Sequence, residues 1–179
     1  MLQLAVEFGA ANEEREFGAW TGYRLPDDRT AWHPLVARLY EYWLTVKPSC
    51  RLPGRQHIVP EEIAPLWSRL VLFDVVQRPL RFRYCFCGSE LVRAFGCEVT
   101  GRWLDEVHPQ MMADPDPRDR FRFMATTGMP TWRRGRPHWV ANPDHRTVES
   151  CVVPLATDGA TVDKMLGITV AFDMNGREI

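Results

Sequence analysis

The sequence predicts an α+β fold built on a five-stranded antiparallel sheet, and three observations support this. The chain has 179 residues, of which 45% are apolar, so it is long enough to form one domain with its own core. Five segments have the period and composition of strands, two before and three after a run of short helical segments. Strands and helices do not alternate one by one, which argues against a parallel sheet.

Charge and cysteine content exclude several classes of protein. The net charge is −1, so no long-range field would steer the chain onto nucleic acid, and nucleic-acid binding is not expected. The five cysteines lack paired metal-ligand spacing and disulfide density, which favours a reducing cytoplasm. We find neither a signal peptide nor eighteen consecutive apolar residues, so no membrane association is expected. Twenty arginines against two lysines suggest a GC-rich bacterial genome.

The chain begins with a charged arm over residues 1–31, followed by an N-terminal helix within residues 32–48. Pro34 suits the first turn of this helix, which we expect to run to about Leu44. Its apolar positions occupy more than one side, and a helix that is apolar on two sides must bury both. We therefore expect a homodimer or partner face made of Trp32, Tyr40 and Trp43.

Residues 49–175 are predicted to share one core, followed by a tail over residues 176–179. After a short helix from Pro60 to Ser68, the segments LVLFDVV and RFRYCFC read as a hairpin. In the second of these, Phe82, Tyr84 and Phe86 should share one face because strand side chains alternate.

The second half of this domain begins with short helices and ends with strands. The helical segments are SELVRAFG, VTGRWLDEV and DRFRFMATTG. Three strands follow, TWRRGRPHWV, RTVESCVVPLA and VDKMLGITVAF. The expected inner face of the sheet would line the core and any ligand cavity, with Phe82, Tyr84, Phe86, Val152, Leu166, Ile168 and Val170.

Two passages of the chain carry a resemblance to a known family. The first contains Gly96, Gly101, Leu104, Glu106 and Val107 after the hairpin. The second reads Leu52, Pro53, Arg55, His57, Ile58 and Pro60, and is followed by Phe82, Arg83, Tyr84 and Gly88. Together they resemble the PAS sensor domains, and most closely a single-PAS subfamily typical of alphaproteobacteria, over about residues 32 to 172. The resemblance implies a PAS-like sheet with short helices on one face, and here an N-terminal helical extension.

No residue pattern predicts a metal or a bound cofactor. Cys85 and Cys87 should lie on one side of a strand, where Cys151 or Cys97 could join them in a metal or redox site, but buried packing is the simpler interpretation. A haem-binding member of the family needs an axial histidine, for which His108 is the best candidate. A flavin photosensor would need a different sequence around its reactive cysteine than Gly96-Cys97-Glu98.

The resemblance implies a stand-alone, non-catalytic sensor or adaptor in bacterial signal transduction. It would bind a small molecule in its cavity or a signalling protein in trans. An alternative is an anionic-ligand or nucleic-acid site at the arginines between Arg118 and Arg136. A lesser alternative is a small α+β enzyme using the histidines and Asp144, although no motif for nucleophilic or phosphoryl chemistry is present.

Overall fold

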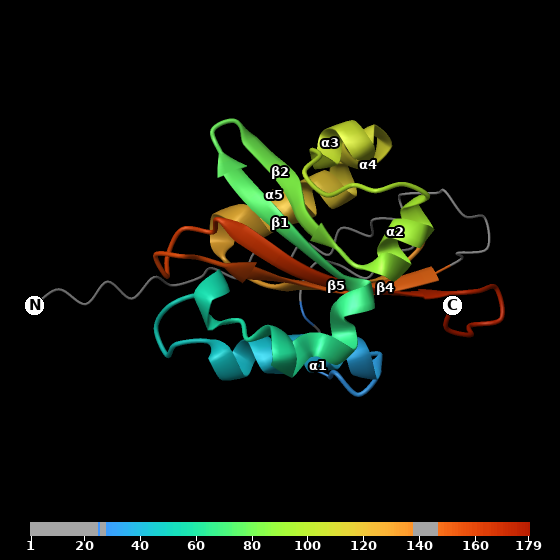
Figure 1. Cartoon of the computed structure of the whole chain (residues 1–179), viewed down its shortest axis with the longest axis horizontal. Helices are drawn as coiled ribbons and strands as arrows, with labels where there is room; N and C mark the ends of the chain where they lie inside the picture. Colours follow the sequence, from blue (N-terminus) through green and yellow to red (C-terminus); the bar gives the residue numbers. More distant parts are fainter. Residues whose placement is uncertain (1–24, 26–27, 138–146) are drawn as a thin grey trace, which may run out of the picture.

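A computed structural model describes residue 25 and residues 28–137 and 147–179. The core of the fold is one antiparallel sheet with the strand order β2-β1-β5-β4-β3 (Figure 1). The strands are β1 (Leu70–Gln77), β2 (Leu80–Cys87), β3 (Thr131–Gly135), β4 (Thr147–Leu155) and β5 (Lys164–Phe172). The predicted α+β fold with five antiparallel strands is therefore confirmed.

The first and last strands are neighbours at the centre of the sheet. β1 pairs with β5 from Leu70 opposite Ile168 to Asp74 opposite Lys164. The hairpin of β1 and β2 thus joins the meander of β3, β4 and β5, as the order of segments in the sequence predicted. The predicted strand over residues 131–140 ends earlier, at Gly135, and its last three residues lie outside the described part of the chain.

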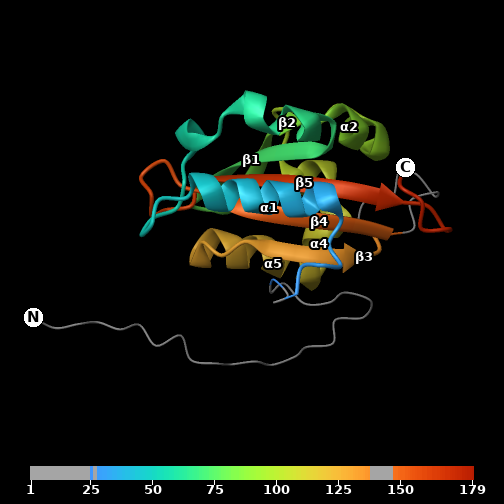
Figure 2. The same ribbon diagram turned by 90° about the horizontal axis from the view of Figure 1, so that it is seen from below.

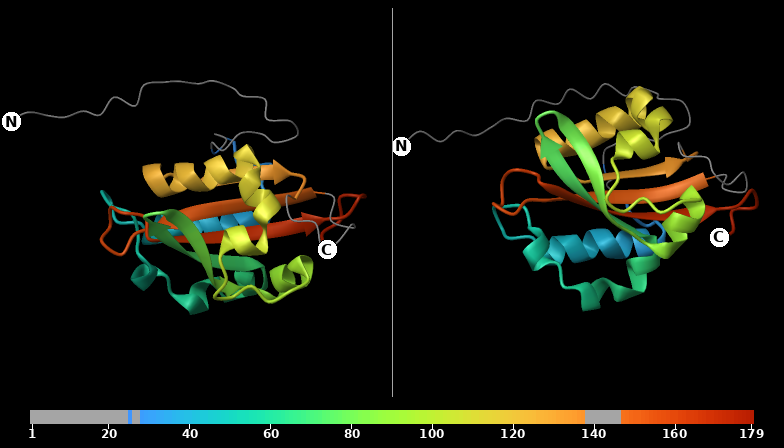
Figure 3. Two further views of the ribbon diagram at one scale, coloured as in Figure 1. Left: turned by 90° about the horizontal axis from the view of Figure 1, so that it is seen from above. Right: turned by 45° about the horizontal axis from the view of Figure 1, so that its top comes forward.

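Helices cover both faces of the sheet (Figures 1 and 2). One face packs against α1 (Pro34–Val46), η1 (Arg55–His57) and η2 (Pro60–Arg69), where η marks a 3-10 helix. The other packs against α2 (Ser89–Phe95), α3 (Leu104–Val107), α4 (Pro109–Ala113) and α5 (Pro115–Thr127) (Figure 3). We refer to these as the α1 face and the α5 face. No described helix has both the length and the hydrophobicity needed to cross a bilayer.

The helix α1 is part of the core rather than an appended segment. His33 caps its first turn, since its Nδ1 accepts a hydrogen bond from the amide of Leu35, and Pro34 follows as the first helical residue. Val36 and Leu39 are fully buried against the sheet. Residues 32–48 and the sheet domain therefore share one hydrophobic cluster.

The three residues expected to form a partner face lie in this cluster. Trp32, Tyr40 and Trp43 are 5%, 8% and 2% exposed. The ring of Trp32 stacks on that of Trp132 with centroids 5.4 Å apart, and Trp43 donates its indole N–H to the carbonyl of Pro154 at 2.9 Å. The apolar sides of α1 face the sheet and η2, so the fold itself covers both, and these side chains are not available to a second chain.

An extra residue in β2 changes which side chains face each layer. Leu72 pairs with Phe86 while the next residue, Phe73, pairs with Tyr84, so Cys85 is a β-bulge. Phe82 and Tyr84 point to the α5 face, whereas Phe86 points to the α1 face. The expectation that Phe82, Tyr84 and Phe86 share one face is therefore wrong.

The first of the two passages that resemble PAS domains, from Gly96 to Val107, lies between α2 and α4. Gly96 ends α2 in the left-handed conformation, with φ of 74°, and Gly101 repeats this at 83°. Leu104 is 1% exposed, and Glu106 accepts a hydrogen bond from Arg81 at 2.9 Å. These residues turn the chain back over the α5 face.

The C-terminal tail folds back onto the end of β5, near the start of α1. Glu178 bridges to Phe172 of β5 and contacts His33 and Arg69 through its carboxylate. The arginine in turn contacts Glu90 of α2, with Nε and Oε2 2.8 Å apart. The tail thus joins α1, η2 and α2.

We expect leucines on the two sides of α1 to differ sharply in their effect on stability. Leu39 is fully buried and Leu44 is 42% exposed. Leu39→Ala should lower the free energy of unfolding by about 2–5 kcal/mol, and Leu44→Ala by no more than about 0.5 kcal/mol. Urea unfolding followed by circular dichroism measures both. Equal losses would show that α1 does not pack as described.

Candidate functional site

The seven residues expected to line one cavity lie on two faces of the sheet. Phe82, Tyr84 and Val152 belong to the α5 face. The other four, Phe86, Leu166, Ile168 and Val170, belong to the α1 face. The bulge at Cys85 turns the side chain of Phe86 to the α1 face. In β5, Leu166, Ile168 and Val170 point to the α1 face, whereas we expected them on the same face as Phe82 and Tyr84. The structure therefore does not bring the seven together around one space.

The α5 face is filled by aromatic rings of the chain itself. The ring of Phe73 lies 4.7 Å from that of Tyr84 and 5.4 Å from that of Phe121, and Phe121 also contacts Phe82 at 5.0 Å, all between centroids. A cavity at the rim of this face, lined in part by Arg81, has a volume of about 160 Å³. Cofactor sites usually enclose about 300 Å³ or more. The described residues of this face therefore do not fit a flavin or a haem.

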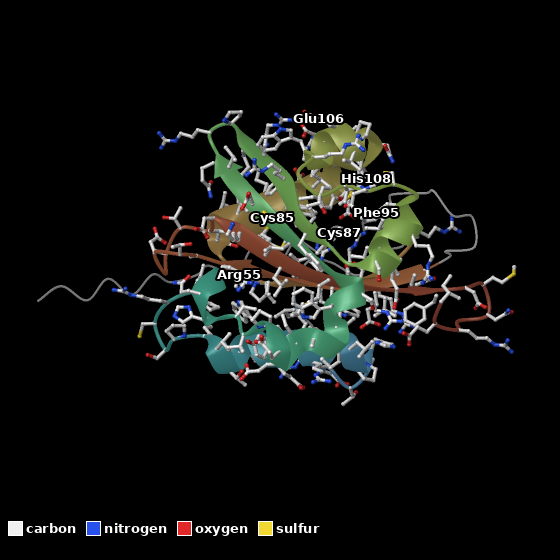
Figure 4. The ribbon with its side chains drawn as sticks, viewed as in Figure 1. Arg55, Cys85, Cys87, Phe95, Glu106 and His108 are labelled. Atoms are coloured by element: carbon white, nitrogen blue, oxygen red, sulfur yellow. The ribbon has the colours of Figure 1, made fainter. Side chains whose placement is uncertain are left out.

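His108 is enclosed at the junction of α3 and α4. The side chain is 5% exposed, and its ring lies 4.8 Å from that of Phe95 and 6.2 Å from that of Tyr84 (Figure 4). Its Nε2 atom is buried without a hydrogen-bond partner among the described residues. Burial, followed by the charge of Arg102, lowers the pKa of His108 to about 4. It is thus a neutral packing residue among aromatic rings.

The cysteines do not form a common site. The bulge places Cys85 beside Asp74, whereas Cys87 lies in the hydrophobic cluster of the α5 face, so the two sulfurs do not share one side as expected. Burial raises the pKa of Cys85 to about 11 and that of Cys87 and Cys151 to about 12. No group of three His, Cys, Asp or Glu side chains within the described ranges could hold a metal ion.

The arginines between Arg118 and Arg136 do not form one basic surface. Arg120 and Arg133 are buried, each 3% exposed. Arg120 donates to the hydroxyl of Thr131 at 2.8 Å and to that of Ser150 at 3.3 Å, so it fixes α5 to the sheet. Arg134 points to the α1 face, where it lies over the ring of Phe172. The histidines and acid of the enzyme alternative fall partly outside the described residues, at His138, Asp144 and His145.

An apolar pocket opens on the α1 face between η2 and the sheet. We call it the η2 pocket, and its volume is about 140 Å³. It is lined by Arg55, Ile58, Pro60, Ile63, Trp67, Leu70, Leu72, Phe86, Leu155 and Leu166. Phe86 and Leu166 are the two that the sequence placed on a cavity wall.

Arg55 is the one charged residue in this lining. It is half-buried at the start of η1 and donates through Nη1 to the carbonyl of Ile58 at 3.0 Å (Figure 4). Arg55 belongs to the Leu52, Pro53, Arg55 passage that resembles PAS domains. Nothing in the sequence indicated, however, that this arginine lines a pocket together with residues of β1, β2 and β5. Trp67, which also lines the pocket, is 40% exposed, and its ring meets that of Phe86 edge-on with centroids 5.2 Å apart.

Polar groups mark the pocket's border along the strands. Leu72 pairs with Leu166, and two residues further Asp74 pairs with Lys164. Burial alone would raise the pKa of Asp74, but hydrogen bonds from Cys85, Lys164 and Arg83 lower it to about 2. The ion pair of Asp74 and Lys164 therefore stays charged at neutral pH and limits the apolar surface on that side.

Comparisons with known proteins find similarity among solved structures alone. Neither protein-family models nor curated protein sequences match the chain. Among solved structures, the light-state structure of the LOV domain of the blue-light photoreceptor Aureochrome1 is similar at 13% identity. The match covers 66% of this chain and 91% of that one, with a TM-score of 0.39. At this level the likeness says nothing about a ligand of this chain.

The low pKa of His108 predicts a specific loss of stability in mild acid. An unfolded histidine takes up its proton near pH 6.5, whereas the folded one resists protonation down to about pH 4. The contribution of His108 to the free energy of unfolding should therefore be constant above pH 6.5 and fall by about 3 kcal/mol as the pH drops from 6.5 to 4. His108→Met should flatten this dependence in urea titrations between pH 4.5 and 7.5. An unchanged slope in the variant would place the titrating group elsewhere.

The thiols should divide into two classes by reactivity. Cys87 and Cys151 are buried and protonated at neutral pH, whereas Cys50 and Cys97 are exposed. Iodoacetamide at pH 7.5 should modify Cys50 and Cys97 in the folded protein and reach the buried pair only in denaturant. Peptide mass spectrometry reports each site. Rapid modification of Cys87 in the native protein would contradict its packing.

Proposed function

We propose that the chain is a PAS-like sensor or adaptor domain in bacterial signal transduction that performs no catalysis. The strand order supports this, because the first and last strands meet at the centre of the sheet while helices α2 to α5 fold over one face. The two passages that resemble PAS domains support it as well. The protein would act in trans, as a homodimer or on a signalling partner.

We place the sensing site in the η2 pocket. This choice rests on the pocket's walls, which come from the sheet on one side and from η1 and η2 on the other. Occupancy of such a pocket would change how the covering layer sits on the sheet. The cavity at the rim of the α5 face is similar in volume but less apolar, because its lining includes Arg81, Asp105, Arg118 and Arg122.

The η2 segment is suited to respond to an occupant. It is a ten-residue 3-10 helix with Pro65 in its interior. Hydrogen-bond geometry is poorer in 3-10 than in α-helices, and a proline removes one backbone donor. Local opening therefore requires less free energy in η2 than in a regular α-helix of the same length. A surface read by a partner would lie over this layer.

Absence of catalysis is supported by the chemistry of the described side chains. His108 is enclosed among aromatic rings, and the thiols of Cys87 and Cys151 have raised pKa values, so none of these three groups is activated for reaction. The anion-binding alternative is less well supported, because two of the six arginines are buried inside the fold.

Filling the η2 pocket should imitate occupancy. Leu72→Phe adds a larger side chain to the pocket wall, and filling a cavity commonly adds about 0.5–2 kcal/mol of stability. Hydrogen–deuterium exchange should slow in η2 by about threefold or more. Val76→Phe is the matched control, on the same strand and the same face but exposed and outside the pocket. Equal effects in both variants, or faster exchange in η2, would contradict a responsive site here.

A further inference from the structure

We propose that the η2 pocket binds an aromatic carboxylate with a single ring. The ring would lie among the apolar side chains between η2 and the sheet, and the carboxylate would meet Arg55. This inference rests on the proposed sensing role of the pocket, to which it adds the chemical class of the ligand.

The size of the pocket sets the size of the ligand. Its volume is about 140 Å³. An enclosed cavity of about 150 Å³ lined by aliphatic and aromatic side chains holds one benzene ring, and the η2 pocket offers a similar volume although it is open to solvent on one side. A flavin, a haem or a nucleotide would need about twice this volume or more. The pocket therefore fits one six-membered ring with a small substituent.

The walls favour an aromatic ring. Trp67 and Phe86 already meet edge-on at one side of the pocket, with an angle of 74° between their planes. Aromatic rings prefer such edge-to-face or offset contacts at centroid distances of about 4.5–7 Å. Ile63, Leu72 and Leu166 supply aliphatic surface around the rest of the space. A third ring would extend the aromatic contact while its other side packs against these side chains.

Arg55 sets the charge of the ligand. A guanidinium carries five N–H donors in a planar fork. Among the described residues, Arg55 donates one hydrogen bond, from Nη1 to the carbonyl of Ile58. No carboxylate among the described residues forms an ion pair with Arg55. The fork geometry matches a carboxylate, whereas a cationic ligand would be repelled. The η2 pocket thus combines an apolar lining with one positively charged side chain, that of Arg55.

Benzoate is the probe that tests this assignment. Titration of the full chain followed by heteronuclear NMR should shift the indole N–H of Trp67 and the methyl groups of Ile63, Leu72 and Leu166, and should saturate. Arg55→Gln should raise the Kd by about tenfold or more, because hydrogen bonds to charged groups contribute about 1.5–3 kcal/mol. Arg51→Gln is the matched control, an exposed arginine of the same connection that does not line the pocket.

Toluene and benzylamine separate shape from charge. Toluene should bind more weakly than benzoate, and benzylamine should bind most weakly, since they share the ring but lack the carboxylate. Leu72→Phe should abolish the benzoate shifts by occupying the same space. If Arg55→Gln proves unstable, Arg55→Lys keeps the positive charge without the fork and should bind benzoate with intermediate affinity.

The outcomes distinguish this inference from the proposed function. Toluene binding as tightly as benzoate, or benzoate affinity unaffected by Arg55→Gln, would overturn the carboxylate assignment and leave the sensing pocket in place. Benzoate shifts located away from η2 would overturn it as well. If no ring compound binds and Leu72→Phe leaves exchange in η2 unchanged, both the ligand and the sensing role of this pocket fall.

Discussion

The bulge at Cys85 is the constraint on which the two faces of the sheet depend. Before it, Phe82 and Tyr84 send their rings into the α5 face; after it, Phe86 sends its ring to the α1 face. Without the extra residue, Phe86 would add to an aromatic layer that is already filled, and the η2 pocket would lose one wall. One inserted residue thus closes the space on one face and shapes the pocket on the other.

Burial on both faces explains why α1 belongs to the core. In β4, every residue from Val148 to Leu155 is buried, so neither face of this strand is left to solvent. A sheet of this kind needs a cover on each side. The sequence showed a helix with two apolar sides, from which we expected a second chain to cover one of them. The chain's own sheet and η2 provide both surfaces instead, because α1 packs on the sheet beside η2.

Prediction from sequence succeeded for the elements and for the meeting of the first hairpin with the last strands, and it failed for the face of the sheet that individual side chains take. Period and turn residues located the hairpin, the stop of α2 at Gly96 and the last two strands, because these signals are local. The bulge at Cys85 leaves no mark in composition or period that separates it from a regular strand. The η2 pocket was not predictable either, since Arg55, Trp67 and Leu166 approach one another only when β5 inserts beside β1.

The ionic contacts at the end of η2 would link binding in the η2 pocket to other elements of the fold. Arg69, the last residue of η2, contacts Glu90 of α2 and Glu178 of the tail, and Glu178 contacts His33 at the start of α1. Partly exposed ion pairs each contribute little to stability, about 0–1 kcal/mol, so they can exchange partners without unfolding the domain. The apolar packing of η2 sets the position of Arg69. A shift of η2 would therefore reach α2, the tail and α1 together.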